Sequence, residues 1–320
     1  MNLGISMFEP HHADLAKRMG ATWAHWTVDL SADVPTDAER HAAAADCGLR
    51  VVTDCRTTLG ALRKVATTEE GVAEYAARIL RYCDAHPVVT DVELWGCAEV
   101  AYIAGTKSPA TDYARILNAV APVIRAARPD IRLWTGGFGS DFDPMFADAC
   151  LAKRVPAENY DVVNWHPLIS LSPPRIENYR EVGSIRLGLA RRHLKHDKPF
   201  TASIFGIPTV PIQRAPDANY GDYWRVGGAR ALLEVEALGW YTAMLTFLGE
   251  EGFEVVCIKA QDHLRPGQTV VREWQQVSGL LRRDGTEKAF VRPLLEWLFE
   301  YGKEPLNQHE TDTPTRLHTD

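Results

Sequence analysis

Short apolar runs alternate with longer segments of helical spacing along nearly the whole chain, and this alternation restricts the possible folds more than any other feature. The apolar runs have the length of strands and end in polar or glycine-rich loops, as strands of a parallel sheet do. Eight alternating units with short connections predict a single-domain (β/α)8 TIM barrel of the α/β class. The expected strands are 3–8, 22–29, 49–56, 91–100, 131–137, 160–169, 200–209 and 253–259.

The segments between these runs carry the signals of helices. A capping-box pattern at 36–39 precedes an alanine-rich stretch that stops at Gly48, and Pro87 stops another stretch. The clearest expected helices are 13–18, 36–48, 69–86, 113–127, 177–196, 222–248 and a last one reaching about residue 301. We expect the barrel to occupy residues 1–302 and the polar residues 303–320 to form a frayed tail.

Composition limits the partners that a chain of this kind can have. With 46% hydrophobic residues the 320-residue chain can bury a large core, and its net charge of −7 argues against a nucleic-acid partner. No apolar run reaches membrane-spanning length, and the N-terminus lacks the features of a secretory signal. The expectation is a cytoplasmic protein with no membrane partner, and the sequence leaves its oligomeric state open.

The chain carries no motif that requires a cofactor or a metal. Six cysteines are scattered without the spacing of a disulfide framework or a zinc site. The glycine-rich loop at 136–141 lacks the Lys-Ser/Thr of a P-loop, so a tight turn is the better interpretation. No cofactor is therefore expected.

The stretch 91–100 reads Asp-Val-Glu-Leu-Trp-Gly-Cys-Ala-Glu-Val, and with the helix and Pro129-Asp130 that follow it resembles the fourth βα unit of clan-A retaining glycoside hydrolases. Two other segments support the resemblance. Residues 161–167 are similar to the family's sixth strand, which ends in His-Pro, and 279–289 are similar to its closing Gly-Leu, Asp-Gly and Lys segment. The β-xylosidase and α-iduronidase branch is the most similar, and it implies an active site at the C-terminal ends of the strands.

Both catalytic positions of the family differ in this sequence. The family ends its fourth strand in Trp-Asn-Glu-Pro, whose Glu is the general acid/base, and the ungapped match places Cys97 there. The nucleophile of the family closes strand seven before a Phe-Gly pair, and the match places Ile204 at that position. Because an aliphatic side chain can neither attack nor accept a proton, the usual double displacement is not expected.

Three other residues are candidates for the missing chemistry. Glu99 has the same strand parity as Cys97 and is a candidate acid, although it could equally be a solvent-facing loop residue. Asp262 follows the last strand and is a candidate second carboxyl, or else a structural hydrogen-bonding group. Cys97 itself is a nucleophile only if its thiol ionises, and the alternative is that a small neutral residue replaced the acid.

A further group of residues is predicted at the mouth of the barrel, where a substrate would bind. Lys259 ends an otherwise apolar strand, so burial without a partner would be costly and a carboxylate or an anionic ligand is expected beside it. Tryptophans suit the apolar face of a sugar but also fill cores. The predicted substrate-binding residues are Glu9, Asp54, Arg56, Trp95, Trp165, His166, Lys259 and Gln261.

These features lead to two main hypotheses of different classes. The first is a glycoside-hydrolase-like enzyme that acts on a glycoside or a related small metabolite through non-standard residues, and the cluster of ionisable groups favours it. The second is a catalytically inactive barrel that binds a carbohydrate or a partner protein. An unrelated barrel enzyme such as an isomerase is a third alternative, less supported because the metal-ligand clusters that such enzymes often need are not apparent in the sequence. The barrel architecture itself does not choose among the three.

Overall fold

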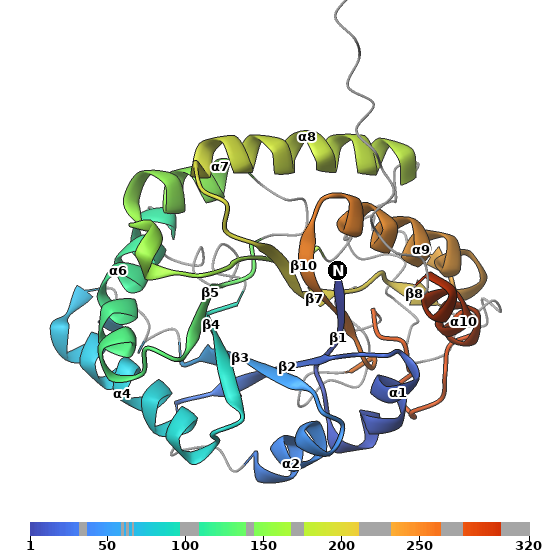
Figure 1. Cartoon of the computed structure of the whole chain (residues 1–320), viewed down its shortest axis with the longest axis horizontal. Helices are drawn as coiled ribbons and strands as arrows, with labels where there is room; N and C mark the ends of the chain where they lie inside the picture. Colours follow the sequence, from blue (N-terminus) through green and yellow to red (C-terminus); the bar gives the residue numbers. More distant parts are fainter. Residues whose placement is uncertain are drawn as a thin grey trace, which may run out of the picture.

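Eight parallel strands form a nearly closed barrel surrounded by helices, which confirms the predicted (β/α)8 TIM-barrel fold (Figure 1). The computed structural model describes residues 1–31, 37–58, 61, 64–65, 67–96, 109–138, 144–167, 176–210, 232–263 and 278–301. The barrel strands are β1 (Asn2–Ser6), β2 (Trp23–Asp29), β3 (Arg50–Arg56), β4 (Val89–Leu94), β5 (Arg132–Thr135), β6 (Val163–Trp165), β7 (Phe200–Phe205) and β10 (Phe253–Lys259).

The strand order explains how the sheet closes. Neighbouring strands run β5-β4-β3-β2-β1-β10-β7-β6, so the first and last barrel strands pair with each other. The two outer members, β5 and β6, meet through a parallel bridge between Trp134 and Val162 and a 3.0 Å hydrogen bond from Thr135 N to Val162 O. All eight C-terminal strand ends therefore lie on one face of the molecule.

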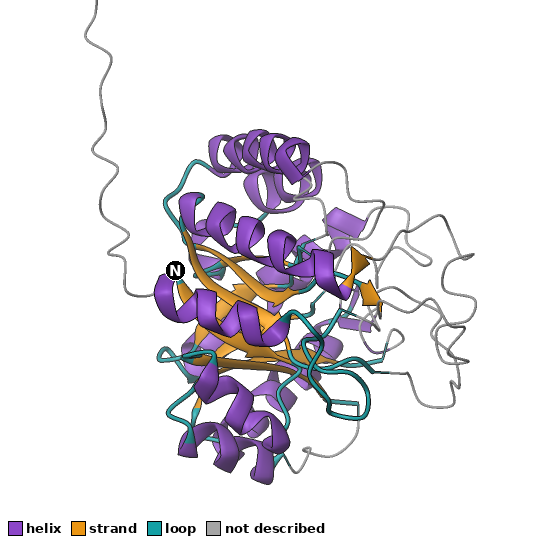
Figure 2. Cartoon of the chain, turned by 90° about the vertical axis from the view of Figure 1, so that its right-hand side faces the viewer, coloured by secondary structure: helices purple, strands orange, loops and turns teal. Residues whose placement is uncertain are grey.

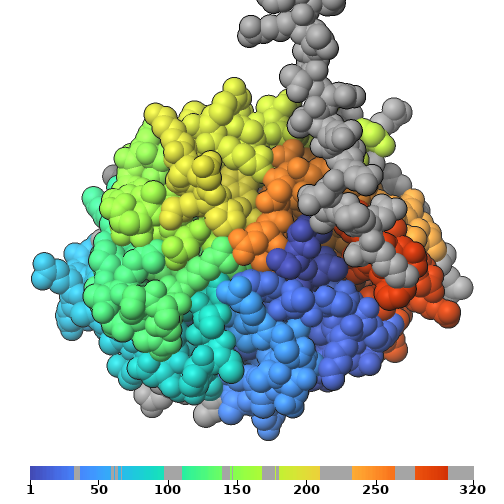
Figure 3. Space-filling model, viewed as in Figure 1, coloured from blue at the N-terminus to red at the C-terminus, as the bar shows by residue number. Residues whose placement is uncertain are grey.

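Helices cover the outside of the sheet (Figure 2). The colours of the chain follow each other around the molecule in sequence order (Figure 3). Local signals set their limits: Thr68 caps α4 by accepting a 3.0 Å hydrogen bond from Gly71 N, and Gly48 ends the turn after α2 with a φ of +67°. No described helix is both long and apolar enough to cross a membrane. The helices of six or more residues are α1 (Ala13–Arg18), α2 (Ala38–Asp46), α4 (Glu69–Ala85), α6 (Pro109–Ala127), α8 (Ile176–Leu194), α9 (Glu234–Glu250) and α10 (Val291–Tyr301).

The core has two separate layers. The larger one fills the space between the sheet and the helices, and the smaller one fills the inside of the barrel near the N-terminal strand ends. Successive strand residues point to opposite faces, so the residue two positions further along each strand also points into the barrel, nearer its C-terminal end. The inner apolar layer consists of Trp23, Val52, Trp134, Val162, Val255 and Cys257.

Some expected boundaries differ from the structure. Strand β4 ends at Leu94 rather than continuing to residue 100, because Trp95 takes a φ of +65° that breaks the extended backbone. The seventh strand ends at Phe205, and Thr209 belongs to a short separate strand, β8 (Thr209–Val210), that pairs with β9 (Leu232–Leu233). The first part of the long helix expected at 222–248 and the tail at 303–320 lie outside the described residues.

Candidate functional site

A layer of polar side chains lies inside the barrel directly above the inner apolar layer, at the C-terminal ends of the strands. It arises because the inward-facing positions of the strands change from apolar to polar along their length, for example from Val52 to Asp54 on β3. Each of these side chains is 3% exposed or less. The polar layer comprises Ser6, His25, Asp54, Glu93, Asn164, His166, Ser203 and Lys259.

Glu93 lies between two histidines in this layer. Its Oε1 is 3.2 Å from His166 Nε2 and accepts a 3.0 Å hydrogen bond from Gly137 N. Its Oε2 is 3.4 Å from His25 Nε2, and neither of these two atoms has a well-aligned hydrogen bond to any described residue. Burial alone would raise the pKa of Glu93, but the charge of His166 and the contacts with both histidines outweigh it and hold this pKa well below its usual range. Glu93 is therefore an ionised, fully buried carboxylate beside two imidazoles.

Each histidine is held in place by a second polar partner. His25 Nδ1 is 2.9 Å from Ser6 Oγ, and His166 Nε2 is 2.9 Å from Ser203 Oγ. Asn164 in turn donates a 2.8 Å hydrogen bond to Ser203 Oγ and accepts one of 2.9 Å from Ser203 N. These contacts fix the orientation of the two rings relative to Glu93, as a proton-transfer site requires.

Asp54 is a second buried carboxylate next to Glu93. It accepts hydrogen bonds from Arg56 Nε at 2.5 Å and from Gly96 N at 2.7 Å. The position that a Cβ would take on Gly96 is 2.5 Å from Asp54 Oδ2 and 2.8 Å from Glu93 Oε1. The two carboxylates therefore adjoin, and only a glycine fits between them.

The backbone segments around Glu93 pack closely against neighbouring residues, and Trp95 has a strained conformation. A Cβ on Gly137 would lie 2.0 Å from the His166 ring, and one on Gly136 would lie 1.9 Å from Trp95 O. Trp95 holds its positive φ directly after β4, a conformation that costs about 1–3 kcal/mol for a bulky residue. Gly136 and Gly137 thus allow close packing after β5, and strain like that at Trp95 clusters at functional sites. The tight turn that the sequence predicts at 136–141 lies largely outside the described residues, which stop at Phe138.

Lys259 ends β10 on the same inner face, beside a buried ion pair. Lys288 Nζ lies 2.8 Å from Asp262 Oδ1 and 2.8 Å from Thr209 Oγ1. Burial lowers the pKa of Lys259 to about 7, while attraction to Asp262 opposes this change and repulsion from Lys288 adds to it. The sequence predicts a carboxylate or an anionic ligand beside Lys259, and Asp262 is a described carboxylate whose charge acts on it.

Comparison with known proteins identifies the barrel but not its chemistry. No protein-family model matches the sequence, and no curated protein matches it. Among solved structures, an uncultured Clostridium sp. β-glucuronidase superposes with a TM-score of 0.62 and 13% identity, over 93% of this chain and 50% of its own. A Ruminococcus gnavus β-glucuronidase in complex with D-glucuronic acid gives a TM-score of 0.63 at 13% identity, over 93% and 49%. The chain therefore shares the (β/α)8 barrel fold found in these proteins.

A Faecalibacterium prausnitzii β-glucuronidase is similar to the same extent, with a TM-score of 0.60 and 15% identity over 93% of this chain and 48% of its own. This chain thus spans about half the length of the chains it matches. At such low identity the similarity concerns the fold, and the reaction has to be argued from the residues of this glycosidase-like barrel.

The structure brings together four of the sequence-predicted site residues: Asp54, His166 and Lys259 in the polar layer, and Arg56 bound to Asp54. Two others lie elsewhere. Glu9 pairs with Arg40 at 2.5 Å, and Gln261 contacts His11 and the carbonyls of Arg282 and Arg283. These contacts hold loops together at the rim of the barrel.

The remaining predicted residues fall into three groups. Trp95 and Trp165 belong to the apolar layer outside the barrel, and Trp165 packs against Phe138 and Phe200. Asp262 is 3% exposed and pairs with Lys288, which supports a structural role for it. Cys97 and Glu99 lie outside the described residues. Ile204 is buried, with 8% exposure.

Sequence reasoning missed Glu93, His25, Asn164 and Ser203. The signal that could have found His25 and Asn164 is strand parity, since they lie two positions after the inward apolar residues Trp23 and Val162. Glu93 and Ser203 follow the polar residues Asp91 and Thr201, so this signal does not single them out. Within the part of the chain that the structure describes, no three His, Cys, Asp or Glu side chains are placed to hold a metal ion together.

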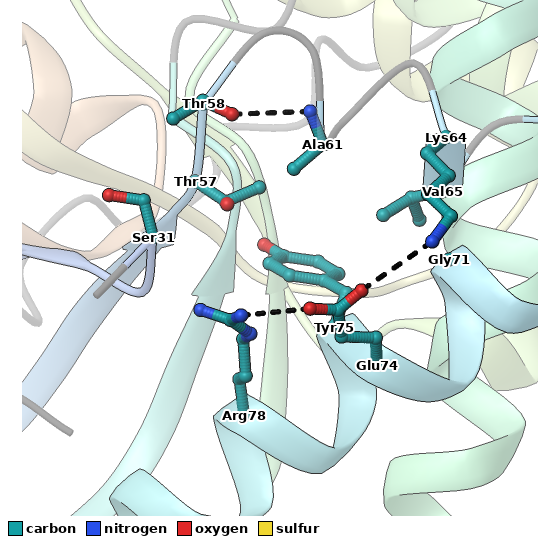
Figure 4. A pocket seen from close by; sticks show the side chains of 10 residues that line it. All are labelled: Ser31, Thr57, Thr58, Ala61, Lys64, Val65, Gly71, Glu74, Tyr75 and Arg78. Atoms are coloured by element: carbon teal, nitrogen blue, oxygen red, sulfur yellow. Dashed lines mark hydrogen bonds and ion pairs between the residues drawn. The ribbon is translucent and has the colours of Figure 1, made fainter. Parts of the chain in front are cut away.

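A small cavity of about 100 Å³ lies outside the barrel wall and is separate from the polar layer (Figure 4). Its walls come from the segments after β2 and β3 and from the start of α4. Arg78 spans it and is already occupied, since it donates to Glu74 at 2.8 Å. The Tyr75 hydroxyl is likewise occupied, since it donates to Cys55 O. We therefore place the candidate site inside the barrel.

Proposed function

We propose that the protein is an enzyme that acts on a glycoside or a related small metabolite, through residues other than the usual pair of glutamates. One observation carries the proposal: an ionised carboxylate, Glu93, contacts two oriented histidines at the C-terminal end of the barrel. Active sites of TIM barrels lie at this end. Groups with strongly shifted pKa values that face one another are associated with catalysis.

The geometry supports proton transfer rather than covalent catalysis by two acids. A retaining glycosidase needs two carboxyls about 5–5.5 Å apart that act on opposite sides of the scissile bond. Asp54 and Glu93 lie on adjacent strands and adjoin at Gly96, so they cannot enclose a sugar from two sides. In the proposed reaction Glu93 orients the rings of His25 and His166, and an imidazole exchanges the proton with the substrate.

The layer also contains groups that suit a polar, hydroxyl-bearing substrate. Two atoms in the layer, His25 Nε2 and Glu93 Oε2, have no well-aligned hydrogen-bond partner among the described residues. The histidine nitrogen can donate or accept a hydrogen bond, and the carboxylate oxygen can accept one. Lys259 and Arg56 add positive charge near the same end of the barrel. A sugar acid would satisfy both features, and for this reason a glucuronide belongs in the substrate panel.

The test is turnover of a panel of 4-nitrophenyl glycosides that includes the β-glucuronide, β-xyloside and β-glucoside. We expect the wild type to release nitrophenol from at least one of them and Glu93→Gln to lose most of this activity. Glu99→Gln and Asp262→Asn test the acids that the sequence predicts, and a larger loss in either variant than in Glu93→Gln would contradict the role of Glu93.

The alternative function is a catalytically inactive barrel that binds a carbohydrate or a partner protein. The aliphatic side chain of Ile204 at the expected nucleophile position favours it, since this residue can supply neither charge nor a proton. The same panel separates the two functions. Sugar binding measured by calorimetry without turnover of any glycoside would support the inactive barrel and contradict the enzyme.

A further inference from the structure

Ser6, His25 and Glu93 form a continuous chain of contacts across the inside of the barrel. Ser6 ends β1, and its register partner on β2 is His25. Ser6 Oγ is 2.9 Å from His25 Nδ1, and His25 Nε2 is 3.4 Å from Glu93 Oε2. All three residues are fully buried. The imidazole thus lies between a hydroxyl and a carboxylate, and a different ring nitrogen faces each of them.

The partners of the His25 ring decide which nitrogen carries the proton. An ionised carboxylate only accepts hydrogen bonds, so Glu93 favours a proton on the facing Nε2. In a neutral imidazole the other nitrogen, Nδ1, then carries the lone pair, and the Ser6 hydroxyl donates to it. This is the form in which a histidine accepts the proton of a serine that attacks an acyl group.

The second serine–histidine pair of the polar layer is arranged differently. His166 Nε2 is 2.9 Å from Ser203 Oγ and 3.2 Å from Glu93 Oε1, so a single nitrogen faces both groups. This nitrogen cannot donate to the carboxylate and accept from the hydroxyl at the same time. Ser203 Oγ also accepts a hydrogen bond from Asn164. The arrangement that activates a serine is therefore specific to Ser6, and Ser203 is an internal comparison.

The backbone after Ser6 provides a hydrogen-bond donor next to the hydroxyl. Met7 takes a φ of +58° where β1 ends, which is a strained conformation for a residue with a long side chain. Phe8 N donates a 3.1 Å hydrogen bond to His25 O, which holds this turn against β2. Met7 N makes no hydrogen bond to another described residue. In serine hydrolases the amide that follows the nucleophile stabilises the oxyanion, and Met7 N has this position relative to Ser6.

We propose that Ser6 is a nucleophile that cleaves small carboxylic esters through an acyl–enzyme. Its Oγ attacks the acyl carbon while His25 Nδ1 takes the hydroxyl proton, and the electrons of the C=O π bond move to oxygen. The intermediate collapses when the C–O bond to the alcohol breaks, and His25 gives the proton to the departing alkoxide. Water then attacks the acyl carbon on Ser6 with the same proton transfers, so ester and water give acid and alcohol.

The burial of the three groups limits the substrate. Because neither Ser6 nor His25 is exposed, the acyl group that reaches them has to be small, and acetyl is the expected one. The reaction shares His25 and Glu93 with the proposed function. It goes beyond that function, because it forms a covalent bond to a serine and cleaves an ester rather than a glycosidic bond.

The experiment is labelling of the full chain with methanesulfonyl fluoride, a small reagent for activated serines, followed by peptide mass spectrometry. We expect a single methanesulfonyl group per chain, on Ser6 and not on Ser203, and a loss of 4-nitrophenyl acetate hydrolysis in proportion to the labelling. Glu93→Gln should label at least about ten times more slowly, because its amide can donate to Nε2 and so favours the proton on Nδ1. Ser31→Ala removes an exposed serine outside the barrel and is the matched control, which should label at the wild-type rate.

A label on Ser203 or on surface serines, with Ser6 unmodified, would overturn the proposal, and so would a chain that takes no label. Equal labelling rates in the wild type and Glu93→Gln would overturn it as well, since Ser6 would then not be activated through His25. The mapping is made on the wild type, so it does not depend on whether a Ser6 variant folds.

The result also separates this proposal from the proposed function. Labelled Ser6 in a protein that turns over no glycoside would support the esterase and contradict the glycosidase-like enzyme. Glycoside turnover with Ser6 unlabelled would do the reverse.

Discussion

Asp54 on β3 and Glu93 on β4 are register partners, and both carboxylates lie within 3 Å of the position that a Cβ would take on Gly96. Two adjacent buried anions repel each other, so each needs its own compensation. Asp54 pairs with the Arg56 guanidinium and accepts a hydrogen bond from the Gly96 amide. Glu93 is contacted by His25, His166 and the Gly137 amide. The polar layer is thus one charged cluster assembled around a glycine.

Gly96→Ala tests this convergence. The added methyl would lie within 3 Å of Asp54, Arg56 and Glu93, so it must displace at least one charged group. We expect the free energy of unfolding to fall by about 1–3 kcal/mol, as overpacking usually causes. Urea denaturation measures it. The control is Gly188→Ala in α8, where nothing lies within 4 Å and a gain of about 0.5–1 kcal/mol is expected. Equal stability of the two variants would argue against the packing described here.

Lys259→Met tests the buried amine through pH. Because the pKa of Lys259 is about 7 in the folded protein and about 10.4 in the unfolded chain, the unfolded chain binds more protons between these values. The stability of the wild type should therefore rise with pH in this window, by at most about 1.4 kcal/mol per pH unit from this residue.

Removing the amine removes this dependence. The stability difference between Lys259→Met and the wild type should be largest at pH 7 and below, and it should shrink as the pH approaches 10. Denaturation at pH 6, 7, 8 and 9 measures it, with the exposed Lys17→Met as the control. A difference that stays constant over this range would show that Lys259 titrates like an ordinary lysine.

The Asp262–Lys288 pair predicts a non-additive double mutant. Lys288→Met leaves a buried carboxylate without its hydrogen-bonded partner and should cost about 3–5 kcal/mol. Adding Asp262→Asn removes the uncompensated charge, so the double variant should lose less stability than the two single variants together. Chemical denaturation of all four proteins gives the coupling energy, and strictly additive losses would contradict a direct interaction.

The fold could be predicted from the sequence because each strand and helix carries its own local signal. The run at 253–259 became β10 without change, and the helix expected at 69–86 became α4 (Glu69–Ala85), one residue before its expected end. The boundary at Trp95 could not be predicted in this way. Its positive φ depends on the close approach of Gly136 from the next unit, which is a tertiary contact and leaves no local pattern.

The candidate site was predictable only in part, for a related reason. Asp54, His166 and Lys259 stand at strand ends, where polar residues attract attention in a sequence. Glu93 lies one residue inside β4, between the apolar Val92 and Leu94, and only the closed barrel brings it against His25 from β2 and His166 after β6. The family motif places its acid at the position of Cys97, so it does not predict a functional residue at Glu93.

The most direct measurement compares kcat/KM of Glu93→Gln and Asp91→Asn on the best glycoside of the panel. Asp91 lies on the same face of β4, two residues before Glu93, and is fully buried on the N-terminal side of the polar layer, where it binds Arg50 and Trp134. We expect Glu93→Gln to lose about 10²–10⁴-fold and folded Asp91→Asn to stay close to the wild type. Equal rates in the two variants, or a wild type that binds sugar without turning over any glycoside, would contradict a catalytic centre at Glu93.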